Sequence, residues 1–139
     1  EHYTLPRVNW EMLNWMDVKL MWDPDLDPVK LRRQFIVGHY GPAAADPVER
    51  VYDKIETLMA ATNITTQYPA GPISRGHNAM IGQENPQCYV YWRPIVAECR
   101  PDINAALAAV RPLATDHKFR RRVARDMKEL LAAAVAPAN

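Results

Sequence analysis

Three short groups of residues in this 139-residue chain have the types and spacing that active sites and metal sites use. In the first group, Ser74, Arg75 and His77 fall close together, and a serine beside a histidine can form a nucleophile and its base. A catalytic triad also needs an orienting carboxylate and an oxyanion hole, and neither has a signature near these residues. The pattern therefore favours a ligand-facing role in a loop over nucleophilic catalysis.

The second group, Asp23, Asp25 and Asp27, alternates like the start of a calcium-binding loop. Carboxylates at alternate positions can converge on one hard cation. However, Pro28 stands where the sharp-turn glycine of such a loop belongs, and Gln34 stands where its closing glutamate belongs. We therefore predict that this segment caps a helix, and we expect no metal and no other cofactor.

The third group is the basic run from Lys118 to Arg125. Asp116, Asp126 and Glu129 interleave with it, and its exposed side offers no aromatic residues on which bases could stack. Across the chain, 17 Lys and Arg residues balance 16 Asp and Glu residues, so there is no overall attraction to a polyanion. The run indicates a solvated helix face, with neither nucleic acid nor a membrane as partner.

No catalytic residue is predicted in this chain. A glycosidase needs two carboxylates that flank the scissile bond, and no such pair can be picked out here. Five acidic residues are predicted at exposed helix positions: Glu11, Asp17, Glu49, Asp53 and Glu56. Cys88 and Cys99 would lie about 16 Å apart on one helix, beyond disulfide reach. We expect both to be free, buried thiols.

The elements that must position these groups are helices. Of all residues, 48% are hydrophobic and 24% charged, and the apolar ones recur at helical spacing in several blocks. No tract approaches the roughly 20 apolar residues that span a bilayer. We predict an all-α bundle of about five to six helices in one compact unit. Residues 1–61 would form three helices, residues 62–86 one long irregular loop, and residues 87–139 the C-terminal helices.

Prolines and caps give the expected helix limits in the first half. The first helix should end near Trp22 because Pro24 cannot continue it, and Asp27 with Pro28 should start the second. The stretch from Gly38 to Pro42 should stop the second helix. Asp46 and Pro47 should start the third. The predicted buried faces are Trp10, Leu13, Met16, Leu20 and Met21, then Leu31, Phe35 and Ile36, then Val48, Val51, Tyr52, Ile55, Leu58 and Met59.

The second half follows the same logic. After Pro86 we expect a helical segment that carries several aromatic residues, with Pro94 and Pro101 each restarting a helix. A last helix should run from about Asp116 to Ala134. Its predicted inner face, together with that of the preceding helix, is Ile103, Leu107, Val110, Phe119, Val123, Met127, Leu130 and Ala134.

The stretch from Met16 to Ala45 resembles a known family segment. It is similar to the region that follows the barrel in large bacterial glycoside-hydrolase-like proteins with the domain of unknown function 4838. In that family a helix ending K-L-(L/M)-W-(D/N)-P leads through an Asp-rich turn to a helix closing with F-x-x-x-Y-Y-G-P-A-A. Residues 19–24 match the first motif, and Phe35 with residues 40–44 match the second, while His39 replaces the usual aromatic residue. The stretch from Ile103 to Leu131 is similar to the family's closing pair of helices.

This resemblance implies a (β/α)8 catalytic barrel upstream that acts on glycans containing N-acetylglucosamine or related sugars. The acidic catalytic residues would then lie before Glu1, and this chain, which begins like the interior of a longer or processed product, would be the barrel-closing helix and the helices packed on it. The 62–86 loop could reach the rim of the sugar site. Aromatic rings pack on pyranose faces and Arg or His can donate to hydroxyls, so the sugar-facing candidates are Tyr68, Arg75, His77, Tyr91 and Trp92.

The apolar residues of the first helix suggest that it binds a partner. It carries Trp10, Trp15 and Trp22 around its circumference, which is more apolar surface than a small surface helix needs. We expect an uncovered apolar patch that meets the upstream barrel or a second copy of the chain. A stand-alone helical module without catalytic activity, which binds another protein through the same helix, is the alternative.

Overall fold

The computed structural model describes residues 10–61 and 88–135. Within these ranges the chain is built of helices α1 (Trp10–Trp22), α2 (Pro28–Tyr40), α3 (Pro42–Ala61), α5 (Cys88–Val110) and α6 (Lys118–Ala133). No strand occurs in the described ranges, so the predicted all-α class is confirmed for them. The predictions made for the 62–86 loop lie outside the described residues.

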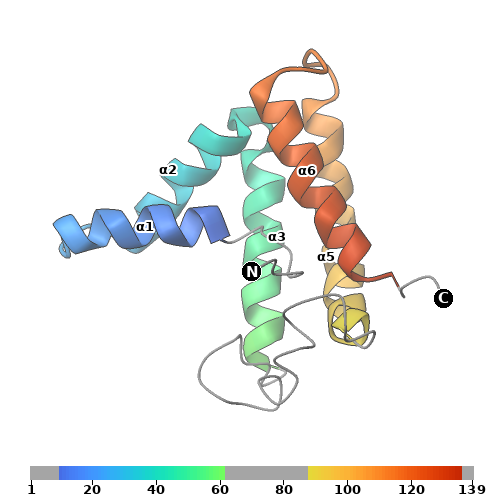
Figure 1. The fold of residues 1–139 in the computed structure, drawn as a ribbon, viewed down its shortest axis with the longest axis horizontal. Helices are drawn as coiled ribbons and strands as arrows, with labels where there is room; N and C mark the ends of the chain where they lie inside the picture. The colour runs from blue at the N-terminus through green and yellow to red at the C-terminus, as the bar shows by residue number, and fades with distance from the viewer. Residues whose placement is uncertain (1–9, 62–87, 136–139) are drawn as a thin grey trace.

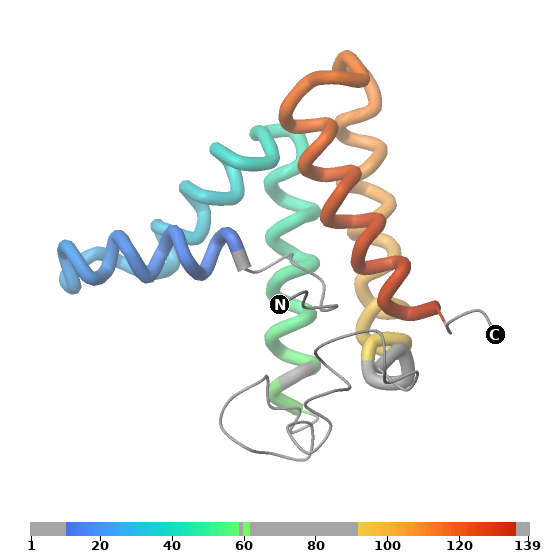
Figure 2. The backbone as a smooth tube through the Cα atoms, viewed as in Figure 1, coloured from blue at the N-terminus to red at the C-terminus, as the bar shows by residue number. Residues whose placement is uncertain are grey.

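Helices α3, α5 and α6 form a bundle, and α1 and α2 form a hairpin that stands away from it (Figures 1 and 2). Within the bundle, α5 packs against both α3 and α6. Helix α2 contacts α1, α3 and α6, so it connects the hairpin to the bundle. The predicted inner faces are buried in the core at these positions: Leu31, Phe35, Ile36, Val48, Val51, Tyr52, Ile55, Ile103, Val110, Val123, Met127 and Leu130.

The turn between α1 and α2 is made by aspartates that hold backbone N–H groups. The Asp27 carboxylate accepts a hydrogen bond from the Val29 amide at 2.9 Å, and the Asp23 carboxylate accepts one from the Asp25 amide at 3.1 Å. Pro28 occupies the first turn of α2, where its missing N–H costs nothing. The predicted helix cap is therefore confirmed, and α1 ends at Trp22 as expected.

The start of α3 differs from the prediction. The helix begins at Pro42, and Pro47 lies inside it rather than at its start. Pro42 offers the same favourable first-turn position, and burial of Ala44 and Ala45 holds the first turn in helical form. Asp46 is thus no cap but pairs with Arg33 at 2.8 Å.

Helix α5 corrects a second prediction. Pro94 and Pro101 do not restart helices, because α5 runs without a break from Cys88 to Val110. Both prolines face solvent, while Ile95, Val96 and Cys99 are buried. Each proline removes one bond of the helical ladder, and burial of the opposite face offsets that loss. Two smaller corrections are that α2 continues through Gly38 and that α6 begins at Lys118, capped by His117.

Ion pairs join α2 to α3. Arg32 pairs with Asp53 at 2.8 Å and with Glu56 at 3.2 Å. The next residue of α2, Arg33, pairs with Asp46 and Glu49, which lie about two turns earlier on α3. Between α3 and α5, Asp102 is clamped by Arg50 at 2.8 Å and Lys54 at 2.7 Å. These pairs add contacts between helices whose orientation the apolar core sets.

The corner between α2 and α3 depends on Gly41. Its φ of 88° lies in the region that favours glycine, and a Cβ built on it would come within 2.5 Å of Cδ2 of Phe119 on α6. By contrast, a Cβ on Gly38, which lies inside α2, would have no heavy atom within 4 Å.

Gly41→Ala is expected to lower the free energy of unfolding by about 2 to 4 kcal/mol, because it adds backbone strain and a clash with Phe119. The matched variant Gly38→Ala should raise it by about 0.5 to 1 kcal/mol, because alanine favours the helix interior. Urea denaturation of both variants measures the difference. Equal stability of Gly41→Ala and wild type would contradict this account of the corner.

Candidate functional site

A buried polar network lies where α2, α3 and α6 meet. The Tyr40 hydroxyl donates to Asp126 Oδ2 at 2.6 Å, and the Tyr52 hydroxyl lies 2.6 Å from the Tyr40 hydroxyl. Tyr40 is 1% exposed, Tyr52 0% and Asp126 2%. Because the Tyr40 proton goes to the carboxylate, the Tyr52 hydroxyl donates to Tyr40.

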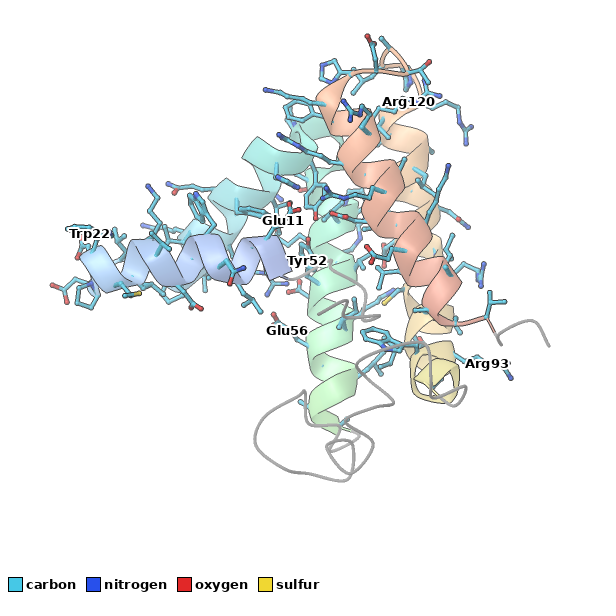
Figure 3. All side chains as sticks on the ribbon, in the orientation of Figure 1. Glu11, Trp22, Tyr52, Glu56, Arg93 and Arg120 are labelled. Carbon is cyan, nitrogen blue, oxygen red and sulfur yellow. The ribbon has the colours of Figure 1, made fainter. Side chains whose placement is uncertain are left out.

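The network continues through charged groups to α1. Asp126 Oδ1 accepts from Nε of Arg125 at 2.8 Å, and Nη2 of Arg125 lies 3.2 Å from Glu11. The other Glu11 oxygen lies 3.0 Å from Nε2 of His39. Figure 3 shows Glu11 at the end of α1 nearest the bundle and Tyr52 on α3 close by. One chain of polar contacts therefore links all three elements of the corner to α1.

Asp126 corrects the sequence analysis, which placed it among the exposed acidic residues of the last helix. Its position was readable from the helical spacing, because it falls three residues after Val123 and four before Leu130, on the apolar face of α6. A carboxylate on a buried face must find donors, since an unpaired buried charge is strongly destabilising. Tyr40 and Arg125 are those donors.

The network is not suited to acid–base catalysis. Burial raises the pKa of Tyr40 and of Tyr52 far above the ordinary value for tyrosine, and the nearby Asp126 charge raises it further. Both hydroxyls therefore stay protonated, and neither reaches solvent where a substrate could bind. The arrangement fastens helices together.

Tyr40→Phe should lower the free energy of unfolding by about 1.5 to 3 kcal/mol, because it removes a buried hydrogen bond to a charged acceptor. The variant keeps the ring that packs beside His39, so loss of packing contributes little. Thermal and urea denaturation measure the change. A loss below about 0.5 kcal/mol would show that the hydrogen bond is not what stabilises this junction.

His39 forms the outer edge of the same junction. Its ring stacks on Phe35 at a centroid distance of 4.8 Å and meets Tyr40 edge-on at 4.7 Å. The histidine thus keeps the ring packing of an aromatic residue and places Nε2 3.0 Å from the Glu11 carboxylate. Burial lowers the pKa of His39, and Arg122 and Arg125 of α6 lower it further, while Glu11 and Asp126 oppose the shift; the pKa lies below its ordinary value of 6.5.

A lowered histidine pKa makes stability depend on pH. The unfolded chain takes up a proton on His39 at higher pH than the folded chain does, so the free energy of unfolding should fall as the pH drops below about 6.5. His39→Gln should flatten this fall between about pH 6.5 and 5. Urea denaturation across this range tests it, and an unchanged slope in the variant would assign the effect to other groups.

The arginines of α6 are engaged more closely than the sequence indicated. Arg120 donates to the Leu113 carbonyl at 2.7 Å and to the Arg111 carbonyl at 3.2 Å, which closes the turn between α5 and α6. Arg122 donates to the His39 carbonyl at 3.2 Å. Together with Arg125, these residues hold neighbouring elements in place. The solvated part of the predicted basic face is Lys118, Arg121 and Lys128.

The outer side of α1 exposes four large apolar side chains, with the polar residues Asn14 and Asp17 between them. Leu13 is 45% exposed, Val18 55%, Met21 83% and Trp22 87%, and we call these four residues the apolar α1 face. On the opposite side Met12 is buried and Trp15 and Met16 pack against the core. Trp22 lies at the end of α1 farthest from the bundle (Figure 3). Of the three tryptophans on which the predicted patch rested, Trp22 is exposed, Trp15 packs against the core, and the side chain of Trp10 lies outside the described set. Leu13 and Met21, predicted to be buried, are exposed.

The candidate sugar-facing residues are not brought together in the described part of the chain. Tyr68, Arg75 and His77 lie outside the described residues, and so does the side chain of Tyr91. Trp92 lies near the start of α5 and packs, partly buried, against the core. Their role stays a prediction.

The remaining candidates involve metals, thiols and membranes. Within residues 10–61 and 88–135, no three His, Cys, Asp or Glu side chains are placed to hold a metal ion.

Cys99 is buried and free, as predicted, and burial raises the pKa of its thiol to about 11, so it is not a thiolate at neutral pH. The side chain of Cys88 lies outside the described set. None of the described helices combines the length and apolar character that crossing a membrane requires.

Comparison with known proteins gives one finding. Residues 6–53 match the family model described as a domain of unknown function, DUF4838. The match supports the domain family that the motifs indicated. No curated protein and no solved structure matches the chain.

The matched segment includes the α1–α2 hairpin and the corner to α3. It covers α1, α2 and α3 as far as the residue after Tyr52. Within it, Tyr40 supplies the donor to Asp126, Gly41 supplies the positive φ, and Pro42 starts α3. The residues that carry the resemblance are therefore those that build the corner and present the apolar α1 face.

Proposed function

We propose that this chain is the C-terminal helical portion of a bacterial glycoside hydrolase and supports a catalytic barrel that docks on the apolar α1 face. The observation that carries the proposal is the exposure of this face, led by Met21 and Trp22. A helix with apolar residues on all sides is normally covered on all sides. The DUF4838 match over residues 6–53 supports the family resemblance, and the barrel is inferred from that resemblance.

The character of the face fits a protein partner. Methionine and tryptophan are enriched in the cores of protein interfaces, and tryptophan is prominent among residues that dominate binding energy. Val29, at the start of α2, is also exposed and extends the apolar surface beyond the turn. The hairpin projects from the bundle, so a partner can reach this surface without displacing α3, α5 or α6 (Figure 1).

In this proposal the chain has no catalytic role of its own. Its carboxylates at the corner are taken up by helix packing: Glu11 by His39 and Arg125, Asp126 by Tyr40 and Arg125. The acidic residues that cleave the glycan belong to the barrel, and the substrate contains N-acetylglucosamine or a related sugar. Tyr68, Arg75, His77, Tyr91 and Trp92 are proposed to face that sugar.

Replacing Met21 and Trp22 together by serine should abolish docking. In the isolated chain we expect wild type to self-associate and to bind a hydrophobic dye, and the double variant to be monomeric with at least a threefold loss of dye fluorescence. Val135→Ser is the matched control, because Val135 is also exposed but lies at the end of α6. Gel filtration and dye titration measure both. A monomeric wild type that binds no dye would contradict the proposal.

An activity assay of the full-length protein tests the proposed glycoside hydrolase activity. It should hydrolyse a chromogenic N-acetylglucosaminide or a related glycoside, while the isolated 139-residue chain should not. If the reading frame upstream of Glu1 encodes no barrel, the glycosidase assignment fails. The exposed α1 face would then belong to a stand-alone protein-interaction module.

A further inference from the structure

A hollow of about 260 Å³ lies between α1, α2 and α6, on the side of the junction where His39 sits. Its lining residues are Trp15, Gln34, Phe35, Gly38, His39 and Arg122. None of them belongs to the apolar α1 face.

One side of the hollow is a wall of rings. The Trp15 and Phe35 centroids lie 5.8 Å apart with their planes tilted by 51°. Phe35 and His39 stack at 4.8 Å with their planes within 18°. Phe35 is only 9% exposed, so an apolar group in the hollow would contact mainly the partly buried Trp15 ring.

Arg122 is the permanently charged residue among those that line the hollow, and no carboxylate is among them. Nη1 of Arg122 donates to the His39 carbonyl, and the described residues supply no other acceptor for this guanidinium, which has five N–H donors. Outside the lining, the Glu11 carboxylate lies 3.0 Å from Nε2 of His39 and 3.2 Å from Nη2 of Arg125. The remaining N–H donors of Arg122 are the groups that an anion in the hollow would meet.

Gly38 is the second observation that indicates a ligand. Glycine inside a helix is unfavourable, and the packing of the described residues does not require it, because a Cβ there would contact nothing within 4 Å. Glycine is typical of positions where a ligand approaches the backbone closely. Any side chain at residue 38 would extend into the space that the hollow provides.

We propose that this hollow binds a small organic acid, with its carboxylate on Arg122 and Gln34 and its apolar ring mainly against Trp15. Arginine matches a carboxylate with parallel N–H donors, and the ring wall accounts for an apolar body beside the charge. Gly38 allows the ligand to lie directly on the backbone of α2. The inference does not depend on docking at the apolar α1 face.

The test uses 3-phenylpropionate as the acid probe and its uncharged amide as the matched control. Titration of the isolated chain, followed by NMR of the Trp15 indole N–H and the Gly38 amide, should show saturable shifts with the acid. The amide should bind at least tenfold more weakly, because it lacks the charge that Arg122 recognises. No saturable shift, or equal affinity for both probes, would overturn the proposal.

Three variants make the result specific. Arg122→Gln should weaken binding of the acid at least tenfold, and Gly38→Leu should abolish it by filling the hollow while the chain stays as stable as wild type. Arg121→Gln, on the exposed side of α6, should leave binding unchanged. Retained affinity in Gly38→Leu would show that the probe binds elsewhere. The Met21 and Trp22 double variant should still bind the acid, so failure of this inference and failure of the docking proposal are distinguishable.

Discussion

The hydrogen bond from Tyr40 to Asp126 is the interaction on which the arrangement of helices depends. A carboxylate that is almost wholly buried destabilises a protein unless donors surround it, so α6 can bury this face only when α2 presents Tyr40 at this point. Gly41 then turns the chain directly after Tyr40, and its lack of a side chain lets Phe119 of α6 approach. The end of α2, the start of α3 and the first turns of α6 are thereby fixed as one unit.

The attachment of α1 is of a different kind. Met12 is buried, Trp15 packs beside Phe35, and Glu11 reaches His39 and Arg125, so the helix is held along one side and at the end nearest the bundle. The other side makes no comparable contacts with the described residues. The contrast between a tightly fastened corner and a helix held on one side separates the part that maintains the fold from the part available to a partner.

Much of the fold followed from local signals in the sequence. Pro24 ended α1, and Asp27 with Pro28 began α2, because caps and first-turn prolines act within a few residues. Local rules failed where burial against other helices determined the helix limits. Helix α3 begins at Pro42 and not at Pro47. Helix α5 continues through Pro94 and Pro101 because its other face is buried against its neighbours.

The sites were harder to predict than the helices. Asp126 looked like one more acidic residue of a charged helix, and only its apolar neighbours in the helical repeat signalled burial. The exposed side of α1 was foreseeable only in part from its tryptophans, because Trp22 is exposed but Trp15 packs against the core. The hollow could not be predicted from the sequence, because Trp15, Gly38 and Arg122 come from three different helices and line one space only in the folded chain.

The length of the α1–α2 hairpin amplifies small rotations at the Gly41 corner. Helix α2 has 13 residues, so Trp22 and the turn after it stand roughly 20 Å from the Gly41 corner. A rotation of about 10° at that corner would move Trp22 by about 3 to 4 Å, which is roughly two-thirds of the rise of one helical turn. The position of the exposed tryptophan therefore depends on contacts at the other end of the hairpin, among them the close approach of Phe119 to Gly41.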